Sequence, residues 1–343
     1  MAEAADKHQL YMQAVQQPRK EVRNLEAIYH TLSTRHLGRS ASLGDDSNQG
    51  RRSATVLRED FCGTAVLCAE WVRARAAATG RRAYGVDIDP AVIQYGRDHV
   101  VGSDDRVQLV CGDVLDVGST DDDDDGSGGG DGGAIPRADI IAAFNFSVFY
   151  FWQRRDLVRY LRHSLGNLGD FGLLFCDVFG GAEATHPQVR RVRDLGSFKY
   201  LFRQHGFDLA TNTVKLSLSF KMKDGSMLSD CFTYKFRIYS ICDLKEAMLE
   251  AGFDHVSVWI STKDDRDDRQ DGDEDEEDGD DDDDDDNGSD DDNGSDDGRN
   301  GESDAGRASN DFGAFAEMRA GMGMPDAFNA YVVGIKLPRT TRS

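Results

Sequence analysis

Three short apolar segments, each ending in an acidic residue, constrain the fold of this chain more than any other feature. The first leads into the run Leu-Arg-Glu-Asp-Phe-Cys-Gly-Thr-Ala at 57–65. The second reads Ala-Tyr-Gly-Val-Asp-Ile-Asp at 83–89, and the third reads Val-Gln-Leu-Val-Cys-Gly-Asp at 107–113. Segments with helical periodicity separate them, and this alternation predicts an open α/β sheet. Because the carboxyl ends of parallel strands meet at one edge of such a sheet, the acids predict a site for a ligand with ribose hydroxyls.

The whole pattern predicts a Rossmann-like, doubly wound sheet of seven mostly parallel strands, with an antiparallel last strand. The predicted strands are one that begins at Val56, followed by 83–87, 107–111, 139–144, 172–178, 255–260 and 330–336. Helices are predicted at 64–79, 90–99 and 154–168, and from a Ser240–Asp243 capping box to Gly252.

Two further parts are predicted around this sheet. Residues 1–53 are expected to form an N-terminal helical lid and a linker, with a helical pattern at 9–32 that Pro18 interrupts. Residues 54–337 are expected to form the main domain. Within it, 181–239 is expected to be a small antiparallel β cap that binds substrate, because the strand-like segments 214–220 and 227–238 are joined by the hairpin sequence Lys-Asp-Gly-Ser.

The net charge of -23 comes from two inserts rather than from the fold. Residues 264–307 hold 25 acidic residues and 4 arginines, and residues 121–131 hold 6 acidic residues and no basic one. The remainder carries about +4, which is ordinary for a globular domain. We predict disordered acidic inserts at 119–133 and 264–307. The sequence from Asp283 begins like an EF-hand loop, but Gly294 stands where its glutamate is required, so no metal is predicted.

The chain has no apolar run of 18 residues and no pattern of a secretory or transit peptide at its N-terminus. Its six cysteines contain no CxxC pair. We therefore expect reduced thiols, no membrane contact and a cytoplasmic location.

At the first turn the chain resembles the class I S-adenosylmethionine-dependent methyltransferases, over about 55–262 and 328–337. Their motif is an acid followed by Gly-x-Gly-x-Gly, and it places Glu59 on the acid and Phe61, Gly63 and Ala65 on the glycines. A subgroup of small bacterial-type methyltransferases that carries the same Leu-Arg-Glu-Asp-Phe-Cys-Gly-Thr-Ala run is similar through most of the chain. We expect Phe61 to adopt an ordinary negative φ and to place its ring beside the cofactor.

The resemblance implies that S-adenosyl-L-methionine is the cofactor. Asp87 would bind both ribose hydroxyls while Ile88 packs on the adenine, and Asp113 with the Val114 amide would read the adenine edge. Asp89 is an alternative to Asp87, although it is better placed to cap the next helix. The full set of predicted cofactor residues is Tyr11, Arg58, Glu59, Phe61, Gly63, Thr64, Ala65, Asp87, Ile88, Asp113, Val114 and Asn145.

The segment Ala-Phe-Asn-Phe-Ser-Val-Phe-Tyr-Phe-Trp at 143–152 stands where the family places the residues beside the transferred methyl group. Asn145 and Tyr150 are the predicted catalytic residues, and Phe146 and Trp152 would complete an aromatic wall. Core packing is the alternative explanation for these aromatic residues. The Asn/Asp-Pro-Pro-aromatic motif of members that methylate nucleic acid or protein is absent.

Substrate contacts are predicted at Asp177, Arg237 and Tyr239. Arg237 and Tyr239 are two residues apart and are expected to face the substrate together, with Tyr234 on the opposite face. If the acceptor is a hydroxyl, it requires a base, and His186 and His205 lie in the right region.

Three functions remain open from the sequence. The first is methyl transfer to nitrogen or oxygen of a small molecule, by an in-line displacement without a metal. The second keeps the cofactor but acts on RNA or protein, with arginines at 154–162 as the only basic cluster; nucleic acid is not the expected partner. The third is a non-catalytic protein whose acidic insert binds a basic protein partner.

Overall fold

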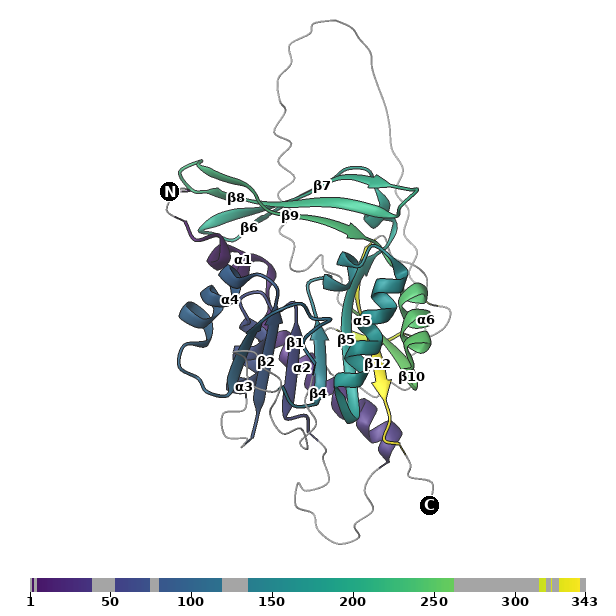
Figure 1. Ribbon diagram of the computed structural model, residues 1–343. Coiled ribbons are helices and arrows are strands. Elements are labelled where there is room, and N and C mark those ends of the chain that lie inside the picture. Colours follow the sequence, from purple (N-terminus) through teal and green to yellow (C-terminus); the bar gives the residue numbers. More distant parts are fainter. Residues whose placement is uncertain are drawn as a thin grey trace, which may run out of the picture.

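The computed structural model describes residues 2, 5–38, 53–74, 80–118, 135–261, 315–318, 322 and 327–339. Within these residues the chain forms one β-sheet of eight strands and a second of four. Helices flank the larger sheet, and the smaller sheet lies across the ends of its strands (Figure 1). The predicted inserts at 119–133 and 264–307 lie outside the described residues.

The larger sheet has the strand order β11-β10-β12-β5-β4-β1-β2-β3. Its strands are β1 (Val56–Asp60), β2 (Arg82–Asp87), β3 (Val107–Cys111), β4 (Ala138–Ala143), β5 (Leu168–Gly180), β10 (His255–Ser261), β11 (Phe315–Glu317) and β12 (Phe328–Lys336). Strands β1 to β5 pair in parallel, and β12 is antiparallel to its neighbours β5 and β10. These pairings confirm the doubly wound sheet with an antiparallel last strand. The count of seven is wrong, because β11 pairs with β10 as an eighth strand that is too short to leave a pattern in the sequence.

The helices cover both faces of this sheet. They are α2 (Pro18–Leu37), α3 (Val66–Ala74), α4 (Pro90–Gly96), α5 (Arg154–Asn167) and α6 (Ile241–Ala251). Leu25 of α2 and Trp71 of α3 pack with Leu57 of β1 on one face. Leu161 of α5 and Met248 of α6 share the cluster on the other face. Each face thus buries its own hydrophobic core, as expected for a mostly parallel sheet.

Local sequence explains where the helices begin and end. Pro18 opens α2, and the predicted capping box of Ser240 and Asp243 is present at the start of α6. Gly252 ends α6 in the left-handed conformation, with a φ of 109°. The helix α4 is shorter than predicted because it continues as a π-helical turn, η2 (Arg97–Val101).

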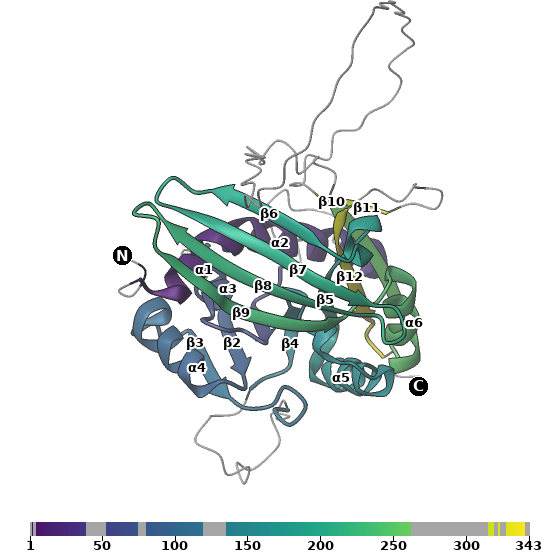
Figure 2. The same cartoon turned by 90° about the horizontal axis from the view of Figure 1, so that it is seen from above.

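The smaller sheet is the cap, an antiparallel sheet with the order β6-β7-β8-β9. Its strands are β6 (Val189–Asp194), β7 (Phe198–Asp208), β8 (Thr213–Met222) and β9 (Met227–Arg237). The predicted hairpin between β8 and β9 is confirmed, whereas β6 and β7 were not predicted as strands. Figure 2, which looks down on the cap, shows its strands crossing over the larger sheet. The helix α1 (Lys7–Val15) packs against the cap through Leu10, Ala14, Phe198 and Phe220.

Candidate functional site

The site lies where the winding of the sheet reverses. From β1 the chain moves outward to β2 and β3, and from β4 it moves the other way to β5, while β1 and β4 are paired neighbours. The crevice outside the carboxyl ends of such a strand pair is where open α/β sheets bind ligands. The turns after β1, β2, β3 and β4 carry the predicted residues from Phe61 to Asn145, so the fold brings them to this one edge.

The turn after β1 is built from left-handed residues. Phe61, Gly63 and Ala65 have φ of 59°, 54° and 60°. The expectation that Phe61 has an ordinary negative φ is therefore wrong: the backbone keeps the conformation that glycine favours, although two of the three positions carry side chains. A left-handed residue other than glycine costs about 1 to 2 kcal/mol. Asp87 helps to hold the turn, because its Oδ2 accepts a hydrogen bond of 2.8 Å from the Gly63 N–H.

The ring of Phe61 packs against two aromatic side chains. Its centroid lies 6.0 Å from that of Phe151 and 5.7 Å from that of Tyr160, and the Tyr160 hydroxyl donates to Asp60 at 2.9 Å. The ring is half-buried against the core on the α5 side of the sheet. This contact explains how the left-handed turn tolerates a large side chain.

The guanidinium of Arg58 is engaged within the fold. Its side chain is 1% exposed and forms an ion pair of 2.7 Å with Asp60. Its remaining donors reach the carbonyl oxygens of Val117 at 2.9 Å and Val114 at 3.4 Å. With its guanidinium used in this way, Arg58 does not belong to the contacts that we propose for the cofactor.

Glu59 lies beneath the turn. It is 4% exposed, and its Oε2 accepts a hydrogen bond of 3.2 Å from the Cys68 N–H at the start of α3. Burial raises the pKa of Glu59 to about 8. Thr64 and Ala65 are also buried, at 6% and 0% exposed, so the side chains of these two residues support the turn from behind.

The ends of β2 and β3 present accessible groups to the crevice. The Oδ1 atom of Asp87 accepts from the Asp89 N–H at 3.0 Å, and Asp89 caps α4 through the Ala91 N–H, as expected. The Ile88 side chain is 69% exposed, which is unusual for an apolar residue of this size. Asp113 is exposed and accepts from the Leu115 N–H at 2.9 Å, whereas Val114 is buried.

Asn145 and Phe146 follow β4, and both have left-handed backbones with φ of 57° and 61°. Asp177 on β5 accepts hydrogen bonds from the two main-chain N–H groups, at 3.0 Å from Asn145 and 2.8 Å from Phe146. Burial raises the pKa of Asp177 to about 8. Both oxygens of Asp177 thus hold the turn that carries Asn145.

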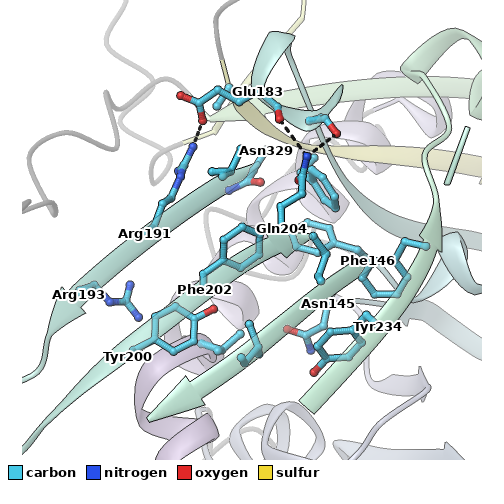
Figure 3. Close-up of a pocket in the computed structure, with 18 of the residues that line it drawn as sticks. Asn145, Phe146, Glu183, Arg191, Arg193, Tyr200, Phe202, Gln204, Tyr234 and Asn329 are labelled. Atoms are coloured by element: carbon cyan, nitrogen blue, oxygen red, sulfur yellow. Dashed lines mark hydrogen bonds and ion pairs between the residues drawn. The ribbon is translucent and has the colours of Figure 1, made fainter. Parts of the chain in front are cut away.

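A pocket of about 370 Å³ opens between this turn and the cap (Figure 3). Its floor includes Asn145 and Phe146, and Tyr11 of α1 contributes to its wall. The strands of the cap contribute the largest group of lining residues, which are Val189, Arg191, Val192, Arg193, Tyr200, Phe202, Gln204, Leu216, Leu218, Tyr234 and Phe236. A cavity of this volume suits a small molecule.

The tyrosines at the junction of lid, cap and sheet lie close together. Burial raises the pKa of Tyr11 well above its usual value, while a hydrogen bond to Tyr234 opposes this effect. Tyr150 is 47% exposed and its ring centroid lies 5.0 Å from that of Phe236. Burial and the nearby Asp87 raise the pKa of Tyr150 to about 12, so its hydroxyl remains a proton donor at neutral pH.

Two predicted substrate residues do not line the pocket. The Nη1 atom of Arg237 donates to the Trp152 carbonyl at 2.7 Å, and the Tyr239 hydroxyl donates to the Phe151 carbonyl at 2.6 Å. The alternation along β9 holds, but the face opposite to Arg237 is the one that meets the pocket, and the strand ends before Tyr239. Tyr234 and Phe236 are the β9 residues that face the pocket.

The pocket residues of β6 and β7 were not predicted from the sequence. In the structure, exposed and half-buried residues alternate along Val-Arg-Arg-Val-Arg-Asp at 189–194, as they do in a half-buried strand. Because three of these residues are arginines, the sequence does not show this alternation as a pattern of apolar and polar residues. His186 and His205, the histidines considered as bases, do not line the pocket: a ring nitrogen of His186 lies 2.7 Å from the Gln188 carbonyl, and one of His205 lies 2.7 Å from the Ser217 hydroxyl.

Within the described ranges, no group of three or more His, Cys, Asp and Glu residues is arranged to hold a metal ion. None of the helices described is both long enough and apolar enough to cross a membrane.

Solved structures share this fold at low sequence identity. A S-adenosylmethionine-dependent methyltransferase from Clostridium acetobutylicum is 12% identical, covers 74% of this chain and 89% of its own, and gives a TM-score of 0.50. DesVI of Streptomyces venezuelae is 12% identical, with 74% of this chain and 91% of that chain covered and a TM-score of 0.51. No family model and no curated protein matches the sequence. The likeness supports the Rossmann-like α/β architecture described above.

Proposed function

We propose that this chain transfers a methyl group from S-adenosylmethionine to nitrogen or oxygen of a small molecule, by an in-line displacement that needs no metal. The observation that carries the proposal is the position of the pocket. It begins at Asn145, at the carboxyl end of β4, and extends beneath the cap, whereas the acids of the neighbouring strand ends lie outside it. One edge of the sheet thus offers two adjoining sites, one for a nucleoside and one for an acceptor.

The residues at the first of these sites fit the cofactor. Each oxygen of Asp87 already accepts one N–H group, and a carboxylate has about four acceptor positions, so both oxygens retain capacity for ribose hydroxyls. The exposed Ile88 offers an apolar surface for the adenine, and Asp113 offers an acceptor for its edge. A methyl group placed on Gly63 would meet no described atom within 4 Å, which leaves space beside the turn.

The bound cofactor would supply a methyl group on a positively charged sulfur. The chain itself would align the acceptor and exclude water from it. In our proposal the Asn145 side chain orients the nucleophilic atom, Asp177 fixes the backbone of Asn145, and Phe146 and Tyr234 form an apolar wall around the reacting groups. Tyr150 would donate a hydrogen bond on the cofactor side, because its raised pKa keeps it protonated.

The acceptor side of the site favours a nucleophile that needs no strong base. Among the described residues that line the pocket there is no histidine, and its one carboxylate, that of Glu183, pairs with Arg191. A neutral amine or an acidic hydroxyl can attack under these conditions, whereas an aliphatic alcohol requires proton removal.

The macromolecular alternative has less support. Two of the arginines that suggested RNA binding already have acidic partners, because Arg154 pairs with Glu250 of α6 at 2.5 Å and Arg155 lies 3.6 Å from Asp156 of its own helix. The proposal of a basic protein partner concerns 264–307, which lies outside the described residues, and it stays a prediction.

Calorimetric titration and labelled methyl transfer test the proposal. We expect saturable binding of S-adenosylmethionine and of its demethylated product, no binding of NAD, and transfer of labelled methyl to one fraction of a metabolite extract. Binding of NAD in preference to S-adenosylmethionine would contradict the proposal, and so would the absence of any binding.

A further inference from the structure

The inner face of β6 carries an unbalanced positive charge. Val189, Arg191 and Arg193 alternate with exposed residues along this strand and face the pocket. Among the described lining residues, two arginines are accompanied by one acid, Glu183. The pocket therefore has one cation in excess.

Arg191 is the cation that the fold neutralises. Its guanidinium forms an ion pair with Glu183 in the short helix η4 (Ala182–Thr185). The Gln204 amide donates to the carbonyl oxygens of Glu183, Ala184 and His186, which fixes the same helix (Figure 3). Arg191 and Gln204 thus hold one wall of the pocket.

Arg193 has no such partner within the described part of the chain. No ion pair joins it to a described carboxylate, and its buried Nε–H donates to no described acceptor. Its guanidinium instead lies 5.4 Å from the centroid of the Tyr200 ring. Because a buried donor on a charged group is costly to leave unpaired, this arrangement points to an anionic ligand.

The groups between Arg193 and Asn145 define the rest of the ligand. Figure 3 shows Tyr200 and Phe202 between Arg193 and the turn that carries Asn145 and Phe146, with Tyr234 next to Asn145. Flat aromatic side chains along this path favour a flat apolar body. One unpaired guanidinium matches the single negative charge of a carboxylate better than the double charge of a phosphate monoester.

We propose that the methyl acceptor carries a carboxylate that Arg193 binds, on a flat apolar body that contacts Tyr200 and Phe202 and presents its nucleophilic atom to Asn145. This inference rests on the proposed function and extends it to the chemical class of the acceptor. The Arg193 site is a specificity site, because it lies on the cap and contacts none of the groups assigned to the cofactor.

Ligand binding tests the inference without any need for methyl transfer. The probes are benzoate, phenylacetate and 3-phenylpropanoate, each compared with its neutral amide and with phenyl phosphate. Dissociation constants are measured by calorimetry or ligand-observed NMR, on the full chain, with and without S-adenosylhomocysteine. The variants are Arg193→Gln and Arg193→Lys, and Arg190→Gln is the matched control because Arg190 lies on the exposed face of the same strand.

We expect at least one carboxylate to bind the unmodified protein about tenfold more tightly than its amide. Arg193→Gln should remove this preference, Arg193→Lys should retain part of it, and Arg190→Gln should leave it unchanged. The inference is wrong if no carboxylate is preferred over its amide, if phenyl phosphate is preferred over all carboxylates, or if Arg190→Gln and Arg193→Gln have equal effects.

The two proposals fail in different ways. A chain that binds S-adenosylmethionine but shows no preference for carboxylates contradicts only the inference about the acceptor. A chain that shows the Arg193-dependent preference but binds no S-adenosylmethionine contradicts the proposed function and leaves the carboxylate site in place.

Discussion

Asp177 accepts a hydrogen bond of 3.0 Å from the main-chain N–H of Asn145 and so joins the end of β4 to β5. The same carboxylate accepts from the next N–H, that of Phe146. Two consecutive left-handed residues are held by one acid at the carboxyl edge of the sheet. The direction in which the Asn145 side chain points therefore depends on a residue of the neighbouring strand.

Replacement of Asp177 by Asn should separate turnover from cofactor binding. The amide keeps one acceptor oxygen but turns its NH₂ group toward a main-chain N–H, which leaves one donor without a partner. We expect kcat to fall by about tenfold or more, since such a loss amounts to about 1 to 3 kcal/mol. The Kd of S-adenosylmethionine should change little. Asp170→Asn, at the exposed opposite end of β5, is the control. If D177N lost as much affinity for S-adenosylmethionine as it lost in kcat, Asp177 would not act through Asn145.

Ala65 offers a measure of the energy stored in the turn after β1. Ala65→Gly and Ala69→Gly each remove a buried methyl group, but only Ala65 has a left-handed backbone, with a φ of 60°. We expect A65G to be less destabilising than A69G by about 1 kcal/mol in urea unfolding. Equal losses would mean that the turn stores no backbone strain at this position.

The raised pKa of Glu59 predicts a pH-dependent stability. The pKa moves from 4.5 to about 8 on folding because of burial, so the folded state keeps a proton that the unfolded state loses between these values. The stabilisation is complete below pH 4.5 and is lost as the pH rises through 8, by up to about 1.4 kcal/mol per pH unit. Glu59→Gln should reduce this slope in urea unfolding between pH 5 and 8. Parallel stability profiles for the two proteins would refute the assignment.

The lid helix α1 meets the sheet domain at Tyr95, which makes a hydrogen bond that can be removed selectively. The Tyr95 hydroxyl, on α4, donates to Oδ2 of Asp6 at 2.5 Å, whereas Oδ1 of Asp6 caps α1. Tyr95→Phe should keep the cap but lower the hydrogen-exchange protection of Lys7–Val15. We expect release of S-adenosylmethionine to accelerate by about threefold to tenfold. Unchanged exchange in α1 would show that this hydrogen bond does not hold the helix.

Much of the fold was accessible from the sequence because apolar strands and capped helices leave local patterns. Asp87, Asp113 and Asn145 were placed at one edge for this reason, since the ends of parallel strands must meet there. The backbone of Phe61 could not be predicted, because its left-handed conformation depends on Asp87 and on the contact with Tyr160. The ion pair of Arg58 with Asp60 could not be predicted, because it depends on the burial of both side chains in the folded chain.

The acceptor side was less accessible than the cofactor side. Arg193 and Tyr200 lie on strands whose polar residues hide the alternation of apolar and polar positions. They are neighbours only because β6 and β7 pair in the folded chain. The facing of Arg237 could not be predicted, because the alternation along β9 does not say which face meets the pocket. Arg237 donates instead to the Trp152 carbonyl, which follows η3 (Ser147–Tyr150).

The central claim is that the edge formed by β1, β2 and β4 binds S-adenosylmethionine through Asp87. Calorimetric titration of the cofactor into the unmodified chain, Asp87→Ala and Asp105→Ala tests it most directly. Asp105 is an exposed acid before β3, at the opposite edge of the sheet. The account predicts saturable binding to the unmodified chain and to D105A, and a loss of at least about tenfold in affinity for D87A. Equal binding to D87A and D105A, or no binding to the unmodified chain, would contradict it.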